Sequence, residues 1–117
     1  MRKKRVGLIG FGFIGRQVFE RLLADEELEP AFVHNRSAGA LSGVPAALRL
    51  NDLAQAAGMK ADLVVEMAHP AFTREFGERL MRHSDYLPLS VTALADDALR
   101  ERLLAAGRVH GTRLLIP

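Results

Sequence analysis

The stretch VGLIGFGFIGRQVFERL, residues 6–22, decides the fold. Three of its glycines, Gly10, Gly12 and Gly15, stand in the order G-x-G-x-x-G. A short apolar run precedes them, and apolar residues spaced three and four apart follow them, which is typical of one face of a helix. The pattern is informative only where it links a strand to a helix within a βαβ unit. Because both flanks fit, the stretch predicts a phosphate-binding turn.

Each glycine of this turn has a separate expected role. Gly10 allows the tight turn, Gly12 lets the backbone approach a pyrophosphate, and Gly15 lets the helix pack closely. We expect the first helical amides, around Gly12, Phe13 and Ile14, to point at the anion with the positive end of the helix dipole behind them. The alternative is a structural glycine-rich bend without a ligand.

The rest of the chain alternates strand-like and helix-like segments, which is typical of a parallel α/β sheet. Strands are expected at 5–9, 31–34 (after Pro30), 48–50, 61–67, 85–90 and 113–116. Helices are expected at 14–24, from a cap at Asn51 or Asp52 through Ala57 with a stop at Gly58, at 70–82, and from a cap at Asp96 to just before Gly107. The sequence therefore predicts a doubly wound parallel sheet, the Rossmann fold, as one dinucleotide-binding domain over residues 1–117.

Composition limits the functional classes. The 117 residues are 49% hydrophobic and 26% charged, with a net charge of +2, which is too small to argue for nucleic acid. No apolar run approaches the ~20 residues that span a bilayer, and the basic start at 1–5 lacks the apolar core of a signal peptide, so we expect a cytoplasmic protein without membrane contact. The absence of cysteine excludes disulfides and thiolate catalysis, and the four histidines lack metal-ligand spacing.

The loops that follow the expected strands carry the candidate ligand contacts. In open α/β sheets, ligands bind outside the carboxyl ends of the strands, where the strand order reverses. Those ends hold residues 10–15, 34–37, 68–70 and 90–93. We expect these four loops to converge on one crevice.

The end of the second strand bears on which dinucleotide binds. An acidic residue about 20 positions beyond the glycines usually binds the ribose 2′-hydroxyl of NAD. Here the segment 33–37 reads VHNRS and has no carboxylate. Arg36 suits a 2′-phosphate, and Asn35 and Ser37 offer hydrogen bonds without repulsion. The sequence therefore favours NADP over NAD, while a solvated loop arginine remains the alternative.

Four longer stretches carry a family resemblance: GFGFIGRQVFERLL, FVHNRSAGALSGVPAALRLNDLA, ADLVVEMAHPAFTREFGERLMRHSDYLPLSVTALADDALRERLL and TRLLIP. Together they cover nearly the whole chain, and VVEMAHP followed by SVTALAD is the most specific part. The sequence resembles the aspartate dehydrogenase family, including its animal domain-containing members. Homoserine dehydrogenases and dihydrodipicolinate reductases share the general plan and are the nearest alternatives.

The resemblance implies NAD(P)-dependent oxidative deamination of L-aspartate, an amino-acid substrate, by a two-domain subunit that forms a homodimer. In that family the catalytic histidine and most substrate-binding groups lie in the second domain, so we expect residues 1–117 to be a fragment without a catalytic residue. The cofactor contacts that the pattern and the resemblance give are Gly10, Gly12, Phe13, Ile14, Gly15, Asn35, Arg36, Ser37, Ala68, His69, Pro70 and Ser90.

Several residues near these contacts have other expected roles. His69 lies beside the expected nicotinamide, but we interpret it as lining the cofactor or shaping the turn rather than as an acid or base. Glu66 is interpreted as a structural residue or a hydrogen-bond acceptor, and His34, His83 and His110 as surface or loop residues. The alternatives to an oxidoreductase domain are a stand-alone nucleotide-binding or redox-sensing module, and an RNA- or partner-binding role for the basic start of the chain.

Overall fold

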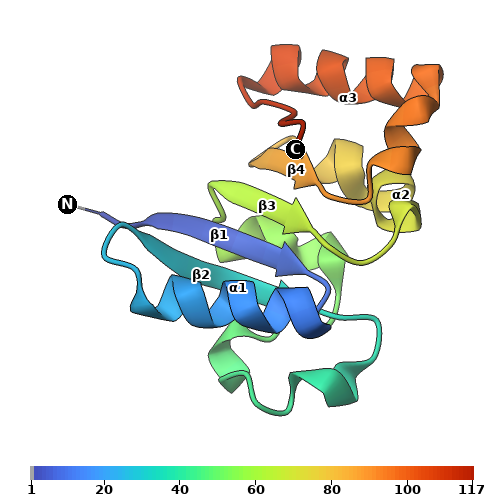
Figure 1. Cartoon of the computed structure of the whole chain (residues 1–117). Coiled ribbons are helices and arrows are strands. Elements are labelled where there is room, and N and C mark those ends of the chain that lie inside the picture. The colour runs from blue at the N-terminus through green and yellow to red at the C-terminus, as the bar shows by residue number, and fades with distance from the viewer. Residues whose placement is uncertain (1) are drawn as a thin grey trace.

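A parallel sheet forms the centre of the computed structural model, which describes residues 2–117 (Figure 1). Its strands are β1 (Lys4–Ile9), β2 (Leu28–His34), β3 (Leu63–Glu66) and β4 (Asp85–Pro88), in the order β2-β1-β3-β4. The α-helices are α1 (Phe13–Ala24), α2 (Pro70–Leu80) and α3 (Asp97–His110). Short 3-10 helices are η1 (Ala38–Leu41), η2 (Ala46–Leu48), η3 (Leu53–Met59) and η4 (Val91–Ala95). The expected doubly wound Rossmann-type α/β fold is confirmed, with four strands in place of the six predicted.

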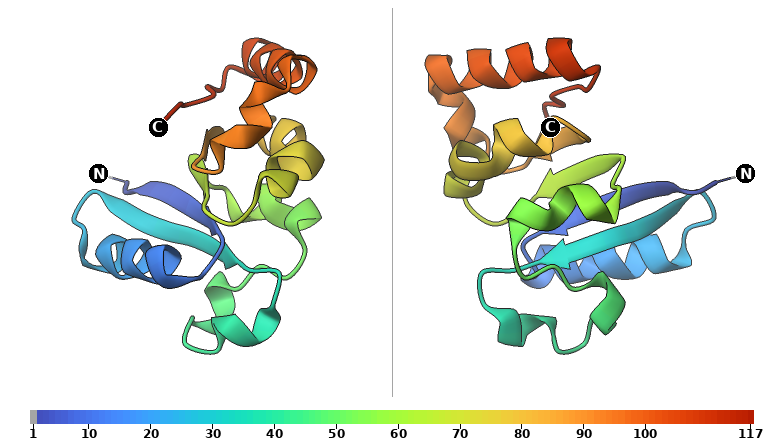
Figure 2. Two further views of the ribbon diagram at one scale, coloured as in Figure 1. Left: turned by 45° about the vertical axis from the view of Figure 1, so that its right-hand side comes forward. Right: turned by 180° about the vertical axis from the view of Figure 1, so that it is seen from behind.

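Helical segments cover both faces of the sheet, and the back view shows η3 on the face opposite α1 (Figure 2). Because successive side chains of a strand point to opposite faces, β1 contributes to two cores. Val6 and Leu8 pack in the core that includes Phe19 of α1, whereas Ile9 packs in the core that includes Leu103 of α3. The sheet is therefore buried on both sides, as the apolar strand sequences predict.

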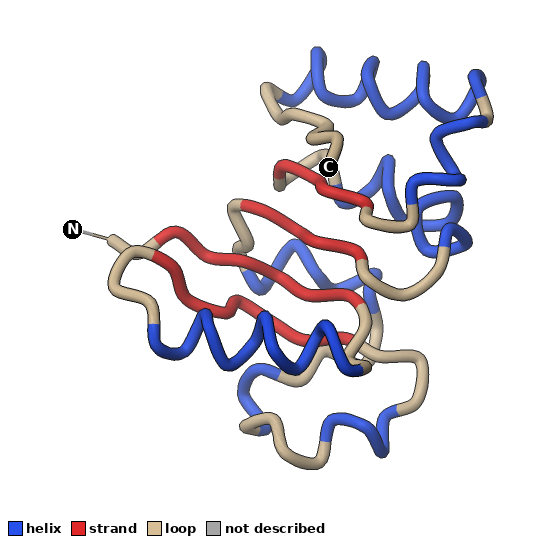
Figure 3. Tube along the Cα trace, in the orientation of Figure 1, coloured by secondary structure: helices blue, strands red, loops and turns tan. Residues whose placement is uncertain are grey.

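The central strand β1 lies at the point where the strand order reverses. It pairs in parallel with β2 on one side and with β3 on the other. All four strands run in the same direction, so the loops that leave their carboxyl ends gather at one edge of the sheet (Figure 3). We call this edge the carboxyl edge.

The pairing of β1 with β2 contains an irregularity around a glycine. Val6 pairs with Pro30 and Gly7 with Phe32, so Ala31 is an extra residue in β2. A Cβ on Gly7 would collide with the Phe32 ring, which lies across the glycine. The strand begins at Leu28 and not after Pro30 as predicted, because the edge position of β2 tolerates a proline.

Two of the predicted strands are wrong, because these segments form only isolated bridges. Residues 48–50 contribute one isolated bridge, from Arg49 to Val33, before the chain turns into η3. Residues 113–116 likewise contribute one bridge, from Leu114 to Tyr86. The amide of Arg113 donates to the Asp85 side chain at 2.9 Å, so a carboxylate replaces the next rung of the ladder.

Two predicted helix ends are also wrong. Helix α3 continues through Gly107 to His110 and ends at Gly111, which has a φ of 71°. Gly107 fits inside the helix because a Cβ there would lie 2.7 Å from the Thr112 carbonyl oxygen, so glycine permits this close approach. Helix η3 passes Gly58 and ends before Lys60. The remaining expected elements are confirmed, with ends shifted by one to a few residues.

Candidate functional site

The turn after β1 has a backbone that requires glycine at Gly10. Its φ is +104°, which side chains rarely adopt, and its amide donates to the His34 carbonyl at 2.7 Å. A Cβ at this position would lie 3.0 Å from the Met67 carbonyl group. The loop after β1 is therefore in close contact with the ends of both neighbouring strands.

Gly12 and Gly15 complete the turn in different ways. A Cβ on Gly15 would collide with the Gly10 carbonyl oxygen, so the absence of a side chain lets α1 pack directly on the turn. Gly12 precedes α1 in an extended conformation, and a Cβ there would meet open space. Gly15 is needed by the fold, whereas nothing in the described chain occupies the space beside Gly12.

The N-terminus of α1 is available for an anion. Within residues 2–117, no side chain caps this helix and its first turn has no acidic residue. Phe13 and Ile14 are exposed there, Phe13 to 76%. Unpaired amides at a helix start carry a partial positive charge and attract phosphate or carboxylate groups. The predicted strand, turn and helix are thus present, and binding of a phosphate there stays a prediction.

Asn35 joins the end of β2 to the glycine turn. Its Oδ1 accepts a hydrogen bond from the Phe11 amide, and its Nδ2 donates to the Ser37 carbonyl, both at 3.0 Å. Sequence reasoning gave Asn35 a direct cofactor contact. In the structure both ends of its side chain bond the protein, and the direct contact stays a prediction.

Arg36 lies on an aromatic side chain that the sequence did not reveal. Its Cζ is 5.6 Å from the centroid of the Phe72 ring in α2, and Arg36 itself is exposed. The Phe72 ring in turn packs edge-on against His34 at 5.8 Å. Reading His34 as a surface or loop residue was wrong, because its ring is buried and its Nδ1 lies 2.7 Å from the Leu50 carbonyl oxygen.

Glu66 ends β3 and is fully buried. Its Oε2 accepts from the Ala68 amide at 2.6 Å and from the Ser90 hydroxyl at 2.8 Å, and its Oε1 accepts from the Ser90 amide at 3.1 Å. The interpretation of Glu66 as a hydrogen-bond acceptor is confirmed. Ser90, a predicted cofactor contact, is bound to Glu66 by both its amide and its hydroxyl.

His69 and Pro70 start α2. The Nδ1 of His69 accepts from the Ala71 amide at 3.0 Å, so this side chain is the helix N-cap, and Pro70 occupies the first turn. Accepting that bond requires a lone pair on Nδ1, which places the proton of the neutral ring on Nε2. The expectation that His69 shapes the turn is confirmed.

The predicted contacts fall on two sides of the carboxyl edge. The β2 side comprises residues 10–15 and 35–37, and the β4 side comprises residues 66–70 and 88–90. Sequence reasoning missed Phe72 as the support of Arg36 and Phe11 as the partner of Asn35. Phe72 lies two residues after Pro70 in the sequence, and only the packing of α2 near the β2 end shows the relation.

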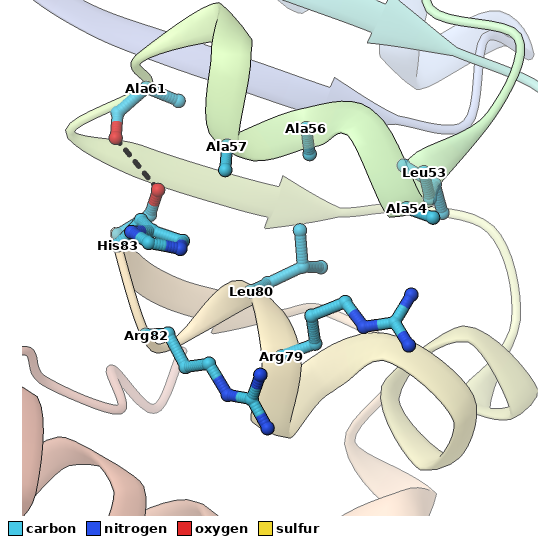
Figure 4. A pocket seen from close by; sticks show the side chains of 10 residues that line it. Leu53, Ala54, Ala56, Ala57, Ala61, Arg79, Leu80, Arg82 and His83 are labelled. Carbon is cyan, nitrogen blue, oxygen red and sulfur yellow. Dashed lines mark hydrogen bonds between the residues drawn. The ribbon is translucent and has the colours of Figure 1, made fainter.

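A separate hollow of about 270 Å³ lies at the opposite end of the sheet (Figure 4). Alanines of η3 line one side and Arg79, Arg82 and His83 of the α2 end line the other, while Ser84 Oγ donates to the Ala61 carbonyl at 2.7 Å. It lies at the amino ends of β3 and β4. Ligands of parallel α/β sheets bind at the carboxyl ends, so this hollow is not the predicted site.

The described residues offer neither a metal site nor a membrane-spanning helix. Residues 2–117 bring together no group of three or more His, Cys, Asp or Glu side chains that could hold a metal ion. Over the same range, none of the helices has the length and apolar character that crossing a bilayer requires.

Comparison with known proteins fits the glycine-turn geometry. Residues 10–117 match the family described as "Homoserine dehydrogenase, NAD binding domain". The chain belongs to this family. It is thus a NAD-binding domain, and the dinucleotide predicted from the glycine turn is confirmed at the level of NAD(P).

Relatives of this NAD-binding domain carry aspartate dehydrogenase names. The chain is 39% identical, over 99% of its length, to an aspartate dehydrogenase domain-containing protein of Xenopus tropicalis, and 37% identical over 97% to L-aspartate dehydrogenase 2 of Bordetella bronchiseptica. It spans 42% and 44% of those two proteins. The structure of aspartate dehydrogenase from Thermotoga maritima has a TM-score of 0.72 at 24% identity, covering 99% of this chain and 46% of that one. The resemblance to aspartate dehydrogenases is confirmed, for the part of their length that the chain spans.

Proposed function

We propose that the carboxyl edge binds a dinucleotide with preference for NADP(H), with the pyrophosphate on the glycine turn and the 2′-phosphate on Arg36. The observation that carries this is an exposed guanidinium at the end of β2, supported by the Phe72 ring, where a carboxylate would select NAD. The contacts proposed are Gly10, Gly12, Phe13, Ile14, Gly15, Arg36, Ser37, Ala68, His69 and Pro70, with Asn35 acting through the turn and Ser90 through Glu66.

The electrostatics of the β2 side support this preference. Residues 35–37 contain one cation and no acid, and the first turn of α1 contains no acid either. A guanidinium forms paired, charge-assisted hydrogen bonds with phosphate oxygens. NAD lacks the 2′-phosphate, so it loses this interaction and keeps the contact of its pyrophosphate with the turn.

A titration with both reduced cofactors tests the preference. We expect the chain to bind NADPH more tightly than NADH, and Arg36→Ala to weaken NADPH by ~1.5–3 kcal/mol while leaving NADH nearly unchanged. Arg79→Ala, at the opposite end of the sheet, is the matched control. Equal losses for both cofactors in Arg36→Ala would show that the arginine does not bind a 2′-phosphate.

The activity proposed for the longer protein is oxidation of L-aspartate by NADP⁺, and the proposed assembly is a homodimer. The similarity to aspartate dehydrogenases supports this, and the chain spans less than half of the two relatives compared above. At the carboxyl edge, Arg36 is the one Lys or Arg among residues 10–12, 35–37, 67–70 and 88–90. We therefore expect the 117 residues by themselves to bind cofactor without turning over L-aspartate, because these loops carry a single cation for two carboxylates, and Arg16, the next guanidinium, lies on the Phe11 ring.

An assay of NADP⁺ reduction with L-aspartate at alkaline pH tests this expectation. The chain is measured after binding of NADPH has been demonstrated, so that a negative result refers to a loaded domain. Turnover by the 117 residues would contradict the proposal and would make His69 a candidate acid or base. The assay is then repeated with a native protein that continues beyond residue 117, where turnover of L-aspartate is expected.

A further inference from the structure

The buried carboxylate of Glu66 connects loops that the sheet itself does not connect. Strands β3 and β4 pair up to Glu66 and Pro88, and beyond them each chain leaves the sheet. Glu66 then accepts three hydrogen bonds, from the Ala68 amide ahead of it and from the amide and hydroxyl of Ser90 on the neighbouring strand. One side chain therefore replaces the missing rungs of the ladder.

The same contacts reach the glycine turn. The Ala68 Cβ lies 3.1 Å from the position that a Cβ on Gly10 would occupy, and the Met67 amide donates to Ile9 at 2.8 Å. The connection from β4 to β1 thus runs from Ser90 through Glu66 to Met67, whose amide bonds the Ile9 carbonyl, and Ala68 lies where it leaves little room for a side chain on Gly10. The turn has its own bond to β2, from the Gly10 amide to the His34 carbonyl at 2.7 Å, so we expect displacement of Ala68 to act mainly on the β4 side.

We infer that Glu66 is a positioning residue that fixes the β4 side of the carboxyl edge for the nicotinamide half of the dinucleotide. This rests on the proposed function, in which the adenosine half lies on the β2 side with Arg36. A dinucleotide binds across the point where the strand order reverses, so its other half lies over the ends of β3 and β4. Those ends are the loops that Glu66 holds.

Replacement by glutamine shows why the carboxylate is needed. Glutamine has one side-chain oxygen and one amino group in place of two oxygens. If the glutamine oxygen faces the Ala68 amide, the glutamine NH₂ group faces the Ser90 amide. In the reverse orientation the NH₂ group faces the Ala68 amide, whose nitrogen lies 2.6 Å from the carboxylate oxygen of Glu66. Either orientation sets two donors against each other, so Glu66→Gln releases one of the two loops.

The experiment compares a probe of one half with the whole dinucleotide. Adenosine 2′,5′-bisphosphate measures the adenosine half, and NADP⁺ measures both halves, each by calorimetry on the 117-residue chain. We expect Glu66→Gln to weaken NADP⁺ about tenfold, as loss of a hydrogen bond to a charged group does, with little change for the bisphosphate. The control is Glu20→Gln, which removes an exposed carboxylate of α1 and should change neither.

A second variant, Ser90→Ala, and a double-mutant cycle with Glu66→Gln separate a positioning role of Glu66 from a general effect on stability. Ser90→Ala removes one hydroxyl donor and keeps the Ser90 amide bond to Glu66, so we expect a smaller loss of NADP⁺ affinity than in Glu66→Gln. The two losses should be less than additive in the double variant because both act through one carboxylate. Ser90→Ala also supplies the measurement if Glu66→Gln does not fold.

The outcomes distinguish this inference from the proposed function. If the unmodified chain binds neither NADP⁺ nor the bisphosphate, the proposed function itself is wrong. If it binds both, and the Glu66 and Ser90 variants weaken the two probes equally or not at all, then Glu66 only stabilises the fold and the inference is overturned. A loss confined to NADP⁺ supports the positioning role.

Discussion

The two sides of the carboxyl edge are built by opposite means. On the β2 side, polar groups are exposed or partly buried, and the Arg36 guanidinium lies over the Phe72 ring. On the β4 side, a fully buried carboxylate holds two backbone amides and a hydroxyl. The β2 side thus exposes a charged group to solvent, whereas the β4 side keeps its charged group buried and uses it to hold two loops.

The glycine turn is the proposed site of the pyrophosphate, which joins the two halves of the dinucleotide, so breaking the turn has the largest expected effect. A Cβ on Gly12 meets no neighbour, so Gly12→Val should fold with nearly unchanged stability while its side chain fills the space proposed for the pyrophosphate. We expect cofactor affinity to fall by about a hundredfold or more. Calorimetry with NADPH measures the loss, and thermal unfolding checks the fold. Gly43→Ala, also facing open space, is the control, and a folded Gly12→Val that binds NADPH normally would exclude pyrophosphate from the turn.

A variant of Asn35 tests whether this residue positions the turn or binds the cofactor directly. Asn35→Ala removes the acceptor of the Phe11 amide and leaves Arg36 in place. We expect affinities for NADPH and NADH to fall together by about 1 kcal/mol, because the loss acts through the turn. Fluorescence titration with both cofactors provides the comparison. A selective loss of NADPH would instead place Asn35 on the 2′-phosphate.

Phe72 tests whether the support of Arg36 matters. Phe72→Leu keeps an apolar side chain in the core and removes the ring beneath the guanidinium. We expect the preference for NADPH over NADH to shrink by ~0.5–1 kcal/mol, the usual size of an exposed cation–π interaction. The ratio of the two affinities is the measurement, since any general loss of stability affects both cofactors alike. An unchanged ratio would show that Arg36 needs no platform.

Asp62 lies at the opposite end of the sheet and gives the smallest expected effect. A hydrogen bond from Arg2, followed by one from the Arg5 amide, lowers the pKa of Asp62 below its usual value. Its contribution to stability is therefore present above about pH 4 and is lost as the pH falls through the lower folded-state pKa. Asp62→Asn should reduce the fall in melting temperature between about pH 6 and pH 3, with cofactor affinity unchanged. The reverse pH trend, or altered NADPH binding, would contradict this assignment.

The sequence predicted the strands, turns and helices around the site better than the contacts between residues that are distant in the chain. Local patterns suffice for the glycine turn and for Arg36, because strand, turn and helix follow one another within a few residues. The partners of Glu66 could not be predicted, since Ser90 is 24 positions away and meets Glu66 only through strand pairing. His34 was misread for a similar reason, because Phe72 of α2 helps to bury it.

The errors in the fold also arise from distant contacts. The segments 48–50 and 113–116 have strand-forming residues, but each finds only a single bridge to a neighbour. Gly107 resembles a helix stop in the sequence, yet it continues α3 because a tight approach of Thr112 requires it there. Helix starts were easier to predict, since the capping side chains of Asp52 and Asp96 accept hydrogen bonds from amides two and three residues further on.

The contact between Gly7 and Phe32 has a consequence for variation among relatives. Because the Phe32 ring occupies the space of a Gly7 side chain, the two positions share one volume on the face opposite α1. A relative with a larger residue at the first position needs a smaller one at the second, and single replacements at Gly7 are accepted only after the ring has been lost. The pair should therefore covary, although neither residue lies among the proposed cofactor contacts.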